Sequence, residues 1–327
     1  MMRPADADAL AAYRNDPVVA KHQLWDVPYS TDQARAALAD QEGTEQIAAG
    51  GGWQLAVERE GTMIGDVFVG LEETGQVAEI GFTFDRRFQG HGYAAEAARA
   101  VAERLFDDYG IVRLYGDLDP PNIASQRTLE AIGLIYETTT KRSFLWRGEW
   151  TDNMSYAATR EEFDAWRHRP RTPPAEVRLV AITHDNHRRH AALRTHHSQE
   201  RFVAPVARSF GDALFPPPGN AGTPLVAVLR GIQADGEPVG FVMTTAATPD
   251  DPEPYLWRLL LDRLHQRRGI GERAVGLLLE EWRAAGVQAV VVSWVDGPGG
   301  PRPFYERLGF VATGEIDNGE VVARLTL

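Results

Sequence analysis

Two short glycine-containing segments are the parts of this chain that could bind a phosphate group. They read Gln89-Gly90-His91-Gly92-Tyr93-Ala94 and Gln266-Arg267-Arg268-Gly269-Ile270-Gly271, each after a strand-like run and before a helix-like run. The first backbone N–H groups of a helix lack partners within the helix, and the helix dipole adds partial positive charge there. Glycine lets an anion approach these amides because no Cβ stands in the way. We therefore expect an anion-binding loop at each position.

The loop pattern, Gln-x-x-Gly-x-Gly/Ala, occurs twice at an offset of 177 positions (266 − 89). A second pair of segments follows it: Leu129-Glu130-Ala131-Ile132-Gly133-Leu134 recurs as Tyr305-Glu306-Arg307-Leu308-Gly309-Phe310, with the glycines 176 positions apart (309 − 133). Two motifs that recur at nearly one offset indicate a duplicated fold. The pattern is not a common nucleotide loop, because it lacks both the Gly-Lys-Ser/Thr of a P-loop and the Gly-x-Gly-x-x-Gly of a dinucleotide fold.

The runs around the first loop predict the elements that must hold it in place. Strands are expected in hairpin order over residues 53–58, 63–71 and 77–84. After the loop we expect a helix over 93–109, a strand over 111–118 and a short helix over 122–132. The loop therefore follows several antiparallel strands rather than the first strand of the domain.

The second half of the chain repeats this order. Strands are expected over 225–232, 238–246 and 255–261, then a helix over 272–285 and strands over 288–295 and 321–327. A strand over 177–183 opens this half, whereas only Met1 and Met2 precede Arg3-Pro4, so the first half lacks much of that strand. The proline-rich stretch 168–174 is the natural linker. We expect one domain over 1–168, a linker over 169–176 and a second domain over 177–327.

Composition limits the classes of function. The chain has 327 residues, 43% of them hydrophobic, a net charge of −12 and no cysteine, which excludes disulfides, thiolate metal sites and a cysteine nucleophile. Residues 1–170 hold 17 basic and 28 acidic residues, so nearly all the acidity lies in the first half. That charge disfavours nucleic acid and favours a cationic small molecule or a basic peptide, although an acidic solvated face would look the same. No apolar run suits a membrane span or signal peptide, so a cytoplasmic protein is expected.

At these motifs the chain resembles the GNAT superfamily of acyl-CoA-dependent N-acyltransferases, once in each half. The first half is similar to the ribosomal-protein alanine N-acetyltransferase (RimJ/RimL) branch in segments 12–17, 64–66, 92–97, 122–125 and 147–150. The second half is similar to spermine/spermidine and diamine acetyltransferases in segments 199–204, 239–243, 257–258, 313–316 and 322–325. The resemblance implies an α/β fold made of two tandem GNAT domains. Each would have a mixed, mostly antiparallel sheet with splayed parallel strands, flanked by helices.

The resemblance also implies acetyl-CoA as the cofactor. The amides of 90–95 and 267–272 would bind its pyrophosphate, and the strand before each loop would bind its pantetheine and acyl groups. The implied residues of the first domain are Phe82, Thr83, Phe84, Gln89, Gly90, His91, Gly92, Tyr93, Ala94, Ala95 and Asn122. Those of the second are Leu259, Leu260, Leu261, Gln266, Arg267, Arg268, Gly269, Ile270, Gly271 and Glu272. The position that aligns with Asn122 is Pro298, so the second domain lacks this asparagine.

Three residues are candidates for catalysis. Attack on a thioester needs a neutral amine, so a base must remove the ammonium proton, and an acid can assist departure of the thiolate. The resemblance gives the acid role to Tyr305, where the first domain has Leu129; the alternative is that Tyr305 only packs a short helix against the sheet. Glu79 is the expected base, or else a solvated edge glutamate. Ser125 would bridge to CoA or its thiol, or would cap a helix together with Asn122.

Histidines and arginines near the second loop allow other interpretations. His184, His187, His190, His196 and His197 invite a metal site, but their spacing follows an Arg-rich helix without an obvious carboxylate partner, so we expect a solvated face and no metal. The side chains of Arg267 and Arg268 either reach CoA phosphates or lie exposed in solvent.

The leading functional hypothesis is acetylation of a primary amine on a small cationic metabolite or antibiotic. The RimJ/RimL-like half suggests an alternative acceptor, a protein N-terminus or another macromolecule. The loss of tyrosine at Leu129 and of asparagine at Pro298 suggests a third hypothesis, in which one domain is a structural or CoA-sensing module. We expect no nucleic-acid or membrane partner, and either a monomer in which the two domains form a pseudo-dimer or a homodimer.

Overall fold

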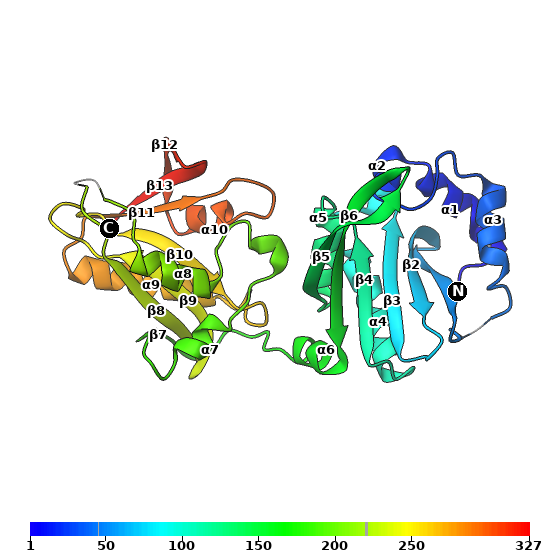
Figure 1. Cartoon of the computed structure of the whole chain (residues 1–327), viewed down its shortest axis with the longest axis horizontal. Coiled ribbons are helices and arrows are strands. Elements are labelled where there is room, and N and C mark those ends of the chain that lie inside the picture. Colours follow the sequence, from blue (N-terminus) through cyan, green and yellow to red (C-terminus); the bar gives the residue numbers. More distant parts are fainter. Residues whose placement is uncertain (45, 220–221) are drawn as a thin grey trace. The chain divides into compact units, whose positions relative to one another are not determined.

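The computed structural model describes residues 1–44, 46–219 and 222–327 and divides the chain into two compact units. Unit 1 is Met1–His168 and unit 2 is Arg169–Leu327. Each unit has one sheet with helices on both faces, as Figure 1 shows for each by itself. Among the described residues, no helix has both the length and the apolar character needed to cross a bilayer.

The sheet of unit 1 has six strands in the order β1-β2-β3-β4-β6-β5. Its strands are β1 (Gly51–Arg59), β2 (Thr62–Leu71), β3 (Val77–Phe84), β4 (Arg113–Leu118), β5 (Ile135–Trp146) and β6 (Glu149–Thr159). Its helices are η1 (Pro4–Asp6), α1 (Ala7–Arg14), α2 (Pro17–Ala20), α3 (Thr31–Ala39), η2 (Arg86–Phe88), α4 (Tyr93–Asp107), α5 (Ile123–Ala131) and α6 (Arg160–Arg167). The elements described before β1 are all helices. The Met2 amide donates to the Gln54 carbonyl of β1 (2.8 Å).

The sheet of unit 2 has seven strands in the order β12-β13-β11-β10-β9-β8-β7. Its strands are β7 (Val177–Ala181), β8 (Ala227–Ala234), β9 (Glu237–Thr245), β10 (Tyr255–Leu261), β11 (Ala289–Trp294), β12 (Val311–Asp317) and β13 (Glu320–Thr326). Its helices are α7 (His187–Ala191), η3 (His197–Gln199), α8 (Val206–Leu214), α9 (Ile270–Ala284) and α10 (Arg302–Arg307). The order of β8 to β13 repeats that of β1 to β6, and β7 adds the opening strand.

One parallel pair in each sheet separates along its length. β3 and β4 pair in parallel from Val77↔Arg113 to Glu79↔Tyr115, although β3 continues to Phe84 and β4 to Leu118. β10 and β11 pair in parallel over Tyr255↔Val291 and Leu256↔Val292 and then diverge in the same way. The other neighbouring pairs among the described strands are antiparallel. This confirms the predicted fold class, a mixed and mostly antiparallel sheet with splayed parallel strands.

The helix that follows each loop packs the same apolar stripe on its sheet. In α4 the stripe consists of Ala98, Ala102, Leu105 and Phe106, and in α9 of Ala274, Val275, Leu278 and Leu279; all are buried. The spacing of three and four residues places these side chains on one face of the helix. A separate apolar cluster joins α1 and α3 in unit 1, and another joins α8 to β9 in unit 2. Packing on α4 and α9 therefore fixes where the two loops lie.

The second repeated motif forms the turn that ends α5 and α10. Gly133 and Gly309 both have positive φ, 105° and 94°. In the two turns, the Leu134 amide donates to the Leu129 carbonyl (3.0 Å), and the Phe310 amide donates to the Tyr305 carbonyl (3.1 Å). Leu129 and Tyr305 therefore occupy equivalent places in the two units.

The segment after His168 lies against unit 2. Arg268 donates through Nε to the Thr172 carbonyl (2.8 Å), and Arg273 of α9 donates to the carbonyls of Pro174 and Ala175 (2.6 and 3.1 Å). This segment has neither helix nor strand and enters unit 2 at β7. The division of the chain falls between His168 and Arg169, at the start of the segment expected as the linker.

Candidate active site

The glycine loop of unit 1 ends at the N-terminus of α4 and opens onto a cavity. Gly92 is the N-cap residue with φ of 88°, and no side chain caps the helix there. The residues of the first turn, Tyr93, Ala94 and Ala95, line a cavity of about 650 Å³. A Cβ built on Gly92 would meet no atom within 4 Å, so the space beside this glycine is open. An uncapped helix N-terminus on a cavity wall suits an anion, and its use for CoA stays a prediction.

The loop of unit 2 repeats this geometry. Gly269 is the N-cap of α9 with φ of 74° and again without a side-chain cap. The loop and the first turn of α9 line a cavity of about 580 Å³. Arg267 takes a left-handed φ of 61° at the place where Gly90 has 79° in unit 1. A non-glycine residue in this region costs about 1–2 kcal/mol, so the loop conformation is kept in unit 2 despite strain.

The glutamine of each motif fixes the loop to the preceding strand. The Gln89 side-chain amide donates to the Phe84 carbonyl at the end of β3 (2.8 Å). The Gln266 side-chain amide donates to the Leu261 carbonyl at the end of β10 (3.1 Å) and to the Gln199 side chain (2.8 Å). The repeated glutamine thus has a structural role, which explains why it stands three residues before the N-cap glycine.

The two cavities collect nearly all the residues expected to bind CoA. Those of unit 1 lie on its cavity wall except His91, whose ring stacks on that of Tyr93 with centroids 5.7 Å apart. Those of unit 2 lie on its cavity wall except Arg268. Arg268 is buried, and its guanidinium donates to Thr172 and contacts His265 Nδ1 at 3.0 Å. The alternative that this side chain lies exposed is therefore wrong, because it holds the segment before β7. Its role toward CoA phosphate stays a prediction.

Asn122 and Ser125 cap α5 and also line the unit 1 cavity. The Asn122 side-chain oxygen accepts the Ser125 backbone amide (3.1 Å), which is a standard N-cap contact. Both residues belong to the cavity wall. The cap therefore coexists with exposure to the cavity, and their role toward CoA stays a prediction.

Tyr305 combines tight packing with a place on the unit 2 cavity wall. Its ring stacks on Trp294 (centroids 5.7 Å apart, planes at 15°) and packs edge-on against Phe304 and Phe310. The side chain is buried, and this burial, with Tyr255 and Glu320 nearby, raises the pKa of the phenol well above its usual range. The hydroxyl therefore stays protonated at any working pH and can serve as a hydrogen-bond donor.

A hydrogen-bonded chain, which the sequence did not suggest, reaches the same cavity. The Tyr255 hydroxyl lies 2.6 Å from Ser293 Oγ, and Ser293 Oγ donates to the Glu320 carboxylate. Ser293 lines the cavity. The chain links a carboxylate at the start of β13 to a hydroxyl on the cavity wall, and could carry a proton between them.

Glu79 is half-buried where β3 and β4 pair. It lies opposite Gly70 on β2 and Tyr115 on β4. Burial, with a smaller contribution from Asp117, raises the pKa of its carboxyl above the usual range. Glu79 does not belong to the wall of the unit 1 cavity, which begins at Phe82 on the same strand. Its role as a base stays a prediction.

A histidine that the sequence did not single out does lie on the unit 1 cavity wall. His22 follows α2, and its Nδ1 is 2.6 Å from a carboxylate oxygen of Asp119, which follows β4. The two residues stand 97 positions apart, so no spacing rule could join them. The convergence of the α2 loop on the end of β4 brings them together.

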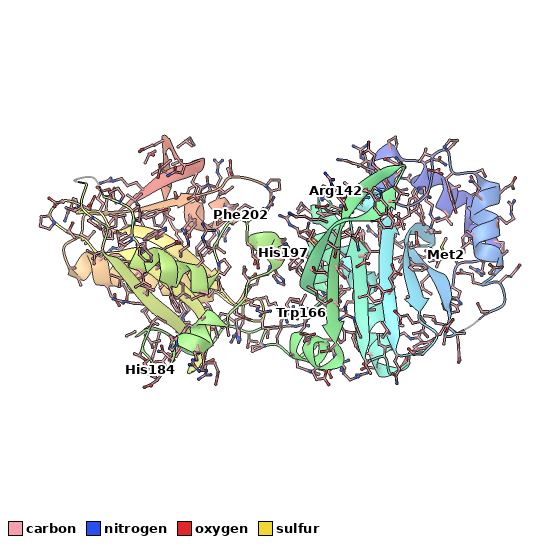
Figure 2. The ribbon with its side chains drawn as sticks, viewed as in Figure 1. Met2, Arg142, Trp166, His184, His197 and Phe202 are labelled. Atoms are coloured by element: carbon pink, nitrogen blue, oxygen red, sulfur yellow. The ribbon has the colours of Figure 1, made fainter. Side chains whose placement is uncertain are left out.

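The five histidines of unit 2 do not share one solvated face. His184 projects from the loop between β7 and α7 with its side chain 96% exposed, as expected (Figure 2). His190 is buried, and a Cβ on Gly231 would lie 2.0 Å from its Nε2, so the ring fills space that this glycine leaves. Burial, with Arg263 as the next cause, lowers the pKa of His196 to about 4. The expectation fails because α7 spans only His187–Ala191 and packs one side on the sheet.

Both halves of the chain match known protein families. Residues 1–135 match the model described as "Acetyltransferase (GNAT) domain", and residues 191–310 match "Acetyltransferase (GNAT) family". One match lies in each unit, so the chain carries two such domains in tandem. The chain belongs to the GNAT acetyltransferase family.

Three similar proteins illustrate the match. An uncharacterized N-acetyltransferase, YnaD, from Bacillus subtilis is 36% identical over 86 residues, 26% of this chain and 51% of that protein. Mycobacterium smegmatis RimJ, solved with CoA-disulfide, is 21% identical with a TM-score of 0.44 over 49% of this chain and 80% of its own. Spermidine N-acetyltransferase from Vibrio cholerae, solved with CoA and spermine, is 16% identical with a TM-score of 0.43 over 50% and 94%. The chain spans about half the length of the first curated relatives that it matches.

Proposed function

We propose that this protein is an acetyl-CoA-dependent N-acetyltransferase whose acceptor is a primary amine of a small cationic molecule. The observation that carries the proposal is the repeated cavity, in which an uncapped helix N-terminus meets two diverging parallel strands. The helix amides suit the CoA pyrophosphate. The gap between the strands has backbone groups without ladder partners, which suit the amides of pantetheine.

In unit 2, Tyr305 donates a hydrogen bond to the departing sulfur of CoA. Its raised pKa keeps the proton on the phenol until negative charge develops on sulfur, when a donor is most stabilising. Ser293 lies on the same wall and connects to Glu320, so this chain offers a route for the proton that the acceptor ammonium must lose.

In unit 1, the acid position is taken by Leu129, which is buried and has no proton to give. Asn122 and Ser125 remain as the polar side chains at the start of α5. Glu79 is one candidate for the base. A thiolate can also leave without an acid, because it is a good leaving group, so the loss of tyrosine slows a unit but does not silence it.

The acidic first half favours a cationic acceptor. Residues 1–170 hold 28 acidic against 17 basic side chains, and such a field raises the local concentration of a cationic amine. A basic protein N-terminus would be favoured in the same way, and the RimJ/RimL-like segments of unit 1 support that acceptor as the alternative.

Release of free CoA thiol tests the proposal. The full chain should release thiol from acetyl-CoA faster with spermidine, aminoglycosides or other amino sugars than with buffer alone. Failure with a broad panel of amines would remove the small-molecule acceptor. Proteome samples incubated with the protein and labelled acetyl-CoA distinguish the alternative, since a label on protein N-termini would identify a macromolecular acceptor.

A further inference from the structure

His22 and Asp119 form a side-chain pair on the unit 1 cavity that no role described above uses. The distance from Nδ1 to the carboxylate oxygen is 2.6 Å, and the side chains are 18% and 37% exposed. His22 shares the cavity wall with Phe82 to Phe84 at the end of β3 and with Ser125. His22 is thus shielded from most of the solvent and lies on the cavity wall, whereas Asp119 is more exposed and does not line the cavity.

Contacts on both sides fix this pair in position. The Trp146 indole of β5 donates to the Gln23 carbonyl next to His22 (3.1 Å), and the Trp25 indole donates to the Arg14 carbonyl at the end of α1 (3.0 Å). On the other side, the Asp119 carbonyl accepts the Asn122 amide at the start of α5 (2.8 Å). A catalytic side chain gains accuracy when its supporting backbone is held in this way.

The carboxylate determines which ring nitrogen can take a proton. Asp119 carries no donor when ionised, so Nδ1 of the neutral ring must hold the hydrogen that the carboxylate accepts. Nε2 then carries the lone pair, and the adjacent carboxylate stabilises the imidazolium that forms when Nε2 is protonated. A base oriented by a third group is the arrangement that activates nucleophiles in many enzymes.

The other titratable groups on the unit 1 cavity wall cannot replace His22 as a proton acceptor. Among the described residues that line this cavity they are Lys21 from the same loop, Tyr93 from α4 and Arg127 from α5. Lysine and arginine are already protonated at neutral pH, and a phenol holds its proton there.

We propose that His22 is the proton acceptor of the unit 1 reaction and that Asp119 is its positioning residue. This inference rests on the proposed function. The acceptor ammonium gives one proton to Nε2, and the freed lone pair forms the C–N bond with the acetyl carbon. The C–S bond then breaks with its electron pair on sulfur, and the second proton lost by nitrogen goes to the thiolate. The imidazolium returns its proton to solvent, so the products are amide, CoA thiol and one proton.

The test uses the full chain carrying Gly269→Glu, which disables the unit 2 loop, so the turnover measured is that of unit 1. The residual rate of the double variant Gly92→Glu/Gly269→Glu is subtracted as the blank. Thiol release is measured from about pH 6 to about pH 9 with three acceptors: spermidine, kanamycin and a peptide with N-terminal alanine. If no amine reacts, hydrolysis of acetyl-CoA by water is measured instead. Acetyl-CoA binding is measured separately by calorimetry. Circular dichroism checks that each variant is folded.

In that background, His22→Gln should lower kcat at least about 100-fold and remove the fall in rate at low pH, with acetyl-CoA affinity kept within about twofold. Asp119→Asn should lower kcat about tenfold, and the double variant should be no slower than His22→Gln. His184→Gln, at an exposed histidine, is the matched control and should leave the rate unchanged.

Turnover that survives His22→Gln within about twofold contradicts the inference, as does a loss in Glu79→Gln that exceeds the loss in His22→Gln. The two proposals can fail separately. If the background protein binds no acetyl-CoA, the proposed function of unit 1 fails and His22 has no reaction to serve. If it binds and turns over acetyl-CoA independently of His22, only the inference about His22 is overturned.

Discussion

At the residue scale, the two units differ in the side chains that could move protons. Unit 2 has the buried phenol of Tyr305 near Tyr255 and Glu320, whereas unit 1 has Leu129 at the same place and the His22–Asp119 pair instead. Two copies of one fold thus carry different polar groups around cavities of similar size. We infer that they differ in rate or in acceptor.

Replacing Tyr305 by phenylalanine should slow the unit 2 reaction without weakening acetyl-CoA binding. The ring contacts with Trp294 and Phe310 survive this change, so the fold should keep its stability. Loss of a donor to the departing sulfur should lower kcat by about 10- to 100-fold. Thiol release in a Gly92→Glu background measures the effect, and an unchanged kcat would remove Tyr305 from the mechanism.

Motif recurrence pointed to the loop glycines and the family resemblance pointed to Tyr305, but neither pointed to His22. The glycines and Tyr305 belong to motifs that recur within the chain, and recurrence is visible without a structure. His22 and Asp119 are ordinary residues in two distant loops, and only the path of α2 past the end of β4 makes them partners. Arg268 shows the reverse case, because a basic residue inside the phosphate loop turned out to hold the segment before β7.

At the element scale, the proposed binding of CoA depends on the left-handed glycine that begins α4 or α9. A side chain at Gly92 or Gly269 is strained by the positive φ, yet its Cβ would enter open space rather than a packed core. Gly110 and Gly286 follow the same helices at their C-terminal ends, with φ of 67° and 78° and equally open surroundings. Gly92 and Gly110 therefore form one matched pair at the two ends of α4, and Gly269 and Gly286 form another at the two ends of α9.

Each Gly→Ala change in these pairs should cost about 1–2 kcal/mol of stability, because the backbone strain is similar. Only Gly92→Ala and Gly269→Ala should also weaken acetyl-CoA binding to their own unit, by about tenfold, which corresponds to about 1.4 kcal/mol. Calorimetry and thermal unfolding separate the two effects. Equal affinity loss in Gly110→Ala would show that general strain, and not the loop, controls binding.

A buried contact between α1 and β2 makes the stability of unit 1 depend on pH. The Tyr13 hydroxyl donates to Asp66, and burial raises the pKa of this carboxyl from 3.8 to about 6, although Tyr13 and Arg14 lower it. Because the folded pKa lies above the unfolded value, the stabilisation is complete below about pH 4 and is lost as pH rises through 6.

Asp66→Asn should remove this pH dependence while keeping an acceptor for Tyr13. Relative to the variant, wild type should lose up to about 3 kcal/mol of unfolding free energy between pH 4 and pH 7. Urea denaturation with hydrogen exchange of α1 and β2 measures unit 1 separately from unit 2. A difference between the two proteins that stays constant with pH would contradict the assignment.

Strong apolar patterns in the sequence predicted the central strands, whereas several peripheral strands and helices have weak patterns and were not predicted. The strands over 77–84 and 255–261 match β3 and β10 to the residue, because apolar runs there end at turn residues. The sequence did not predict β5, whose residues, three of them threonines, lie mostly exposed at the sheet edge and give no apolar alternation. It also did not predict the short helices α1 to α3, which depend on packing against one another rather than on a long amphipathic pattern.

At the scale of the whole molecule, a duplicated fold provides two cavities in one chain. The cavities measure about 650 and 580 Å³ and have the same loop, the same glutamine contact and the same separating strands. We propose that both bind acetyl-CoA, and that the lost tyrosine in unit 1 and the lost asparagine in unit 2 affect chemistry and affinity rather than the presence of a site.

Disrupting the two loops one at a time should then show how much of the turnover each unit contributes. Gly92→Glu and Gly269→Glu each place a carboxylate where the pyrophosphate would lie, so repulsion should abolish binding in one unit and spare the other. If both units are catalytic, each variant should keep part of the turnover and the double variant none. Full turnover in one single variant would identify the altered unit as non-catalytic.

Isothermal titration of the full chain with acetyl-CoA tests the central claim most directly. We expect two binding sites per chain in wild type, one in Gly92→Glu, one in Gly269→Glu and none in the double variant. Binding that survives the double variant, or wild-type protein that binds no acetyl-CoA, would contradict the assignment of the two repeated cavities as CoA sites.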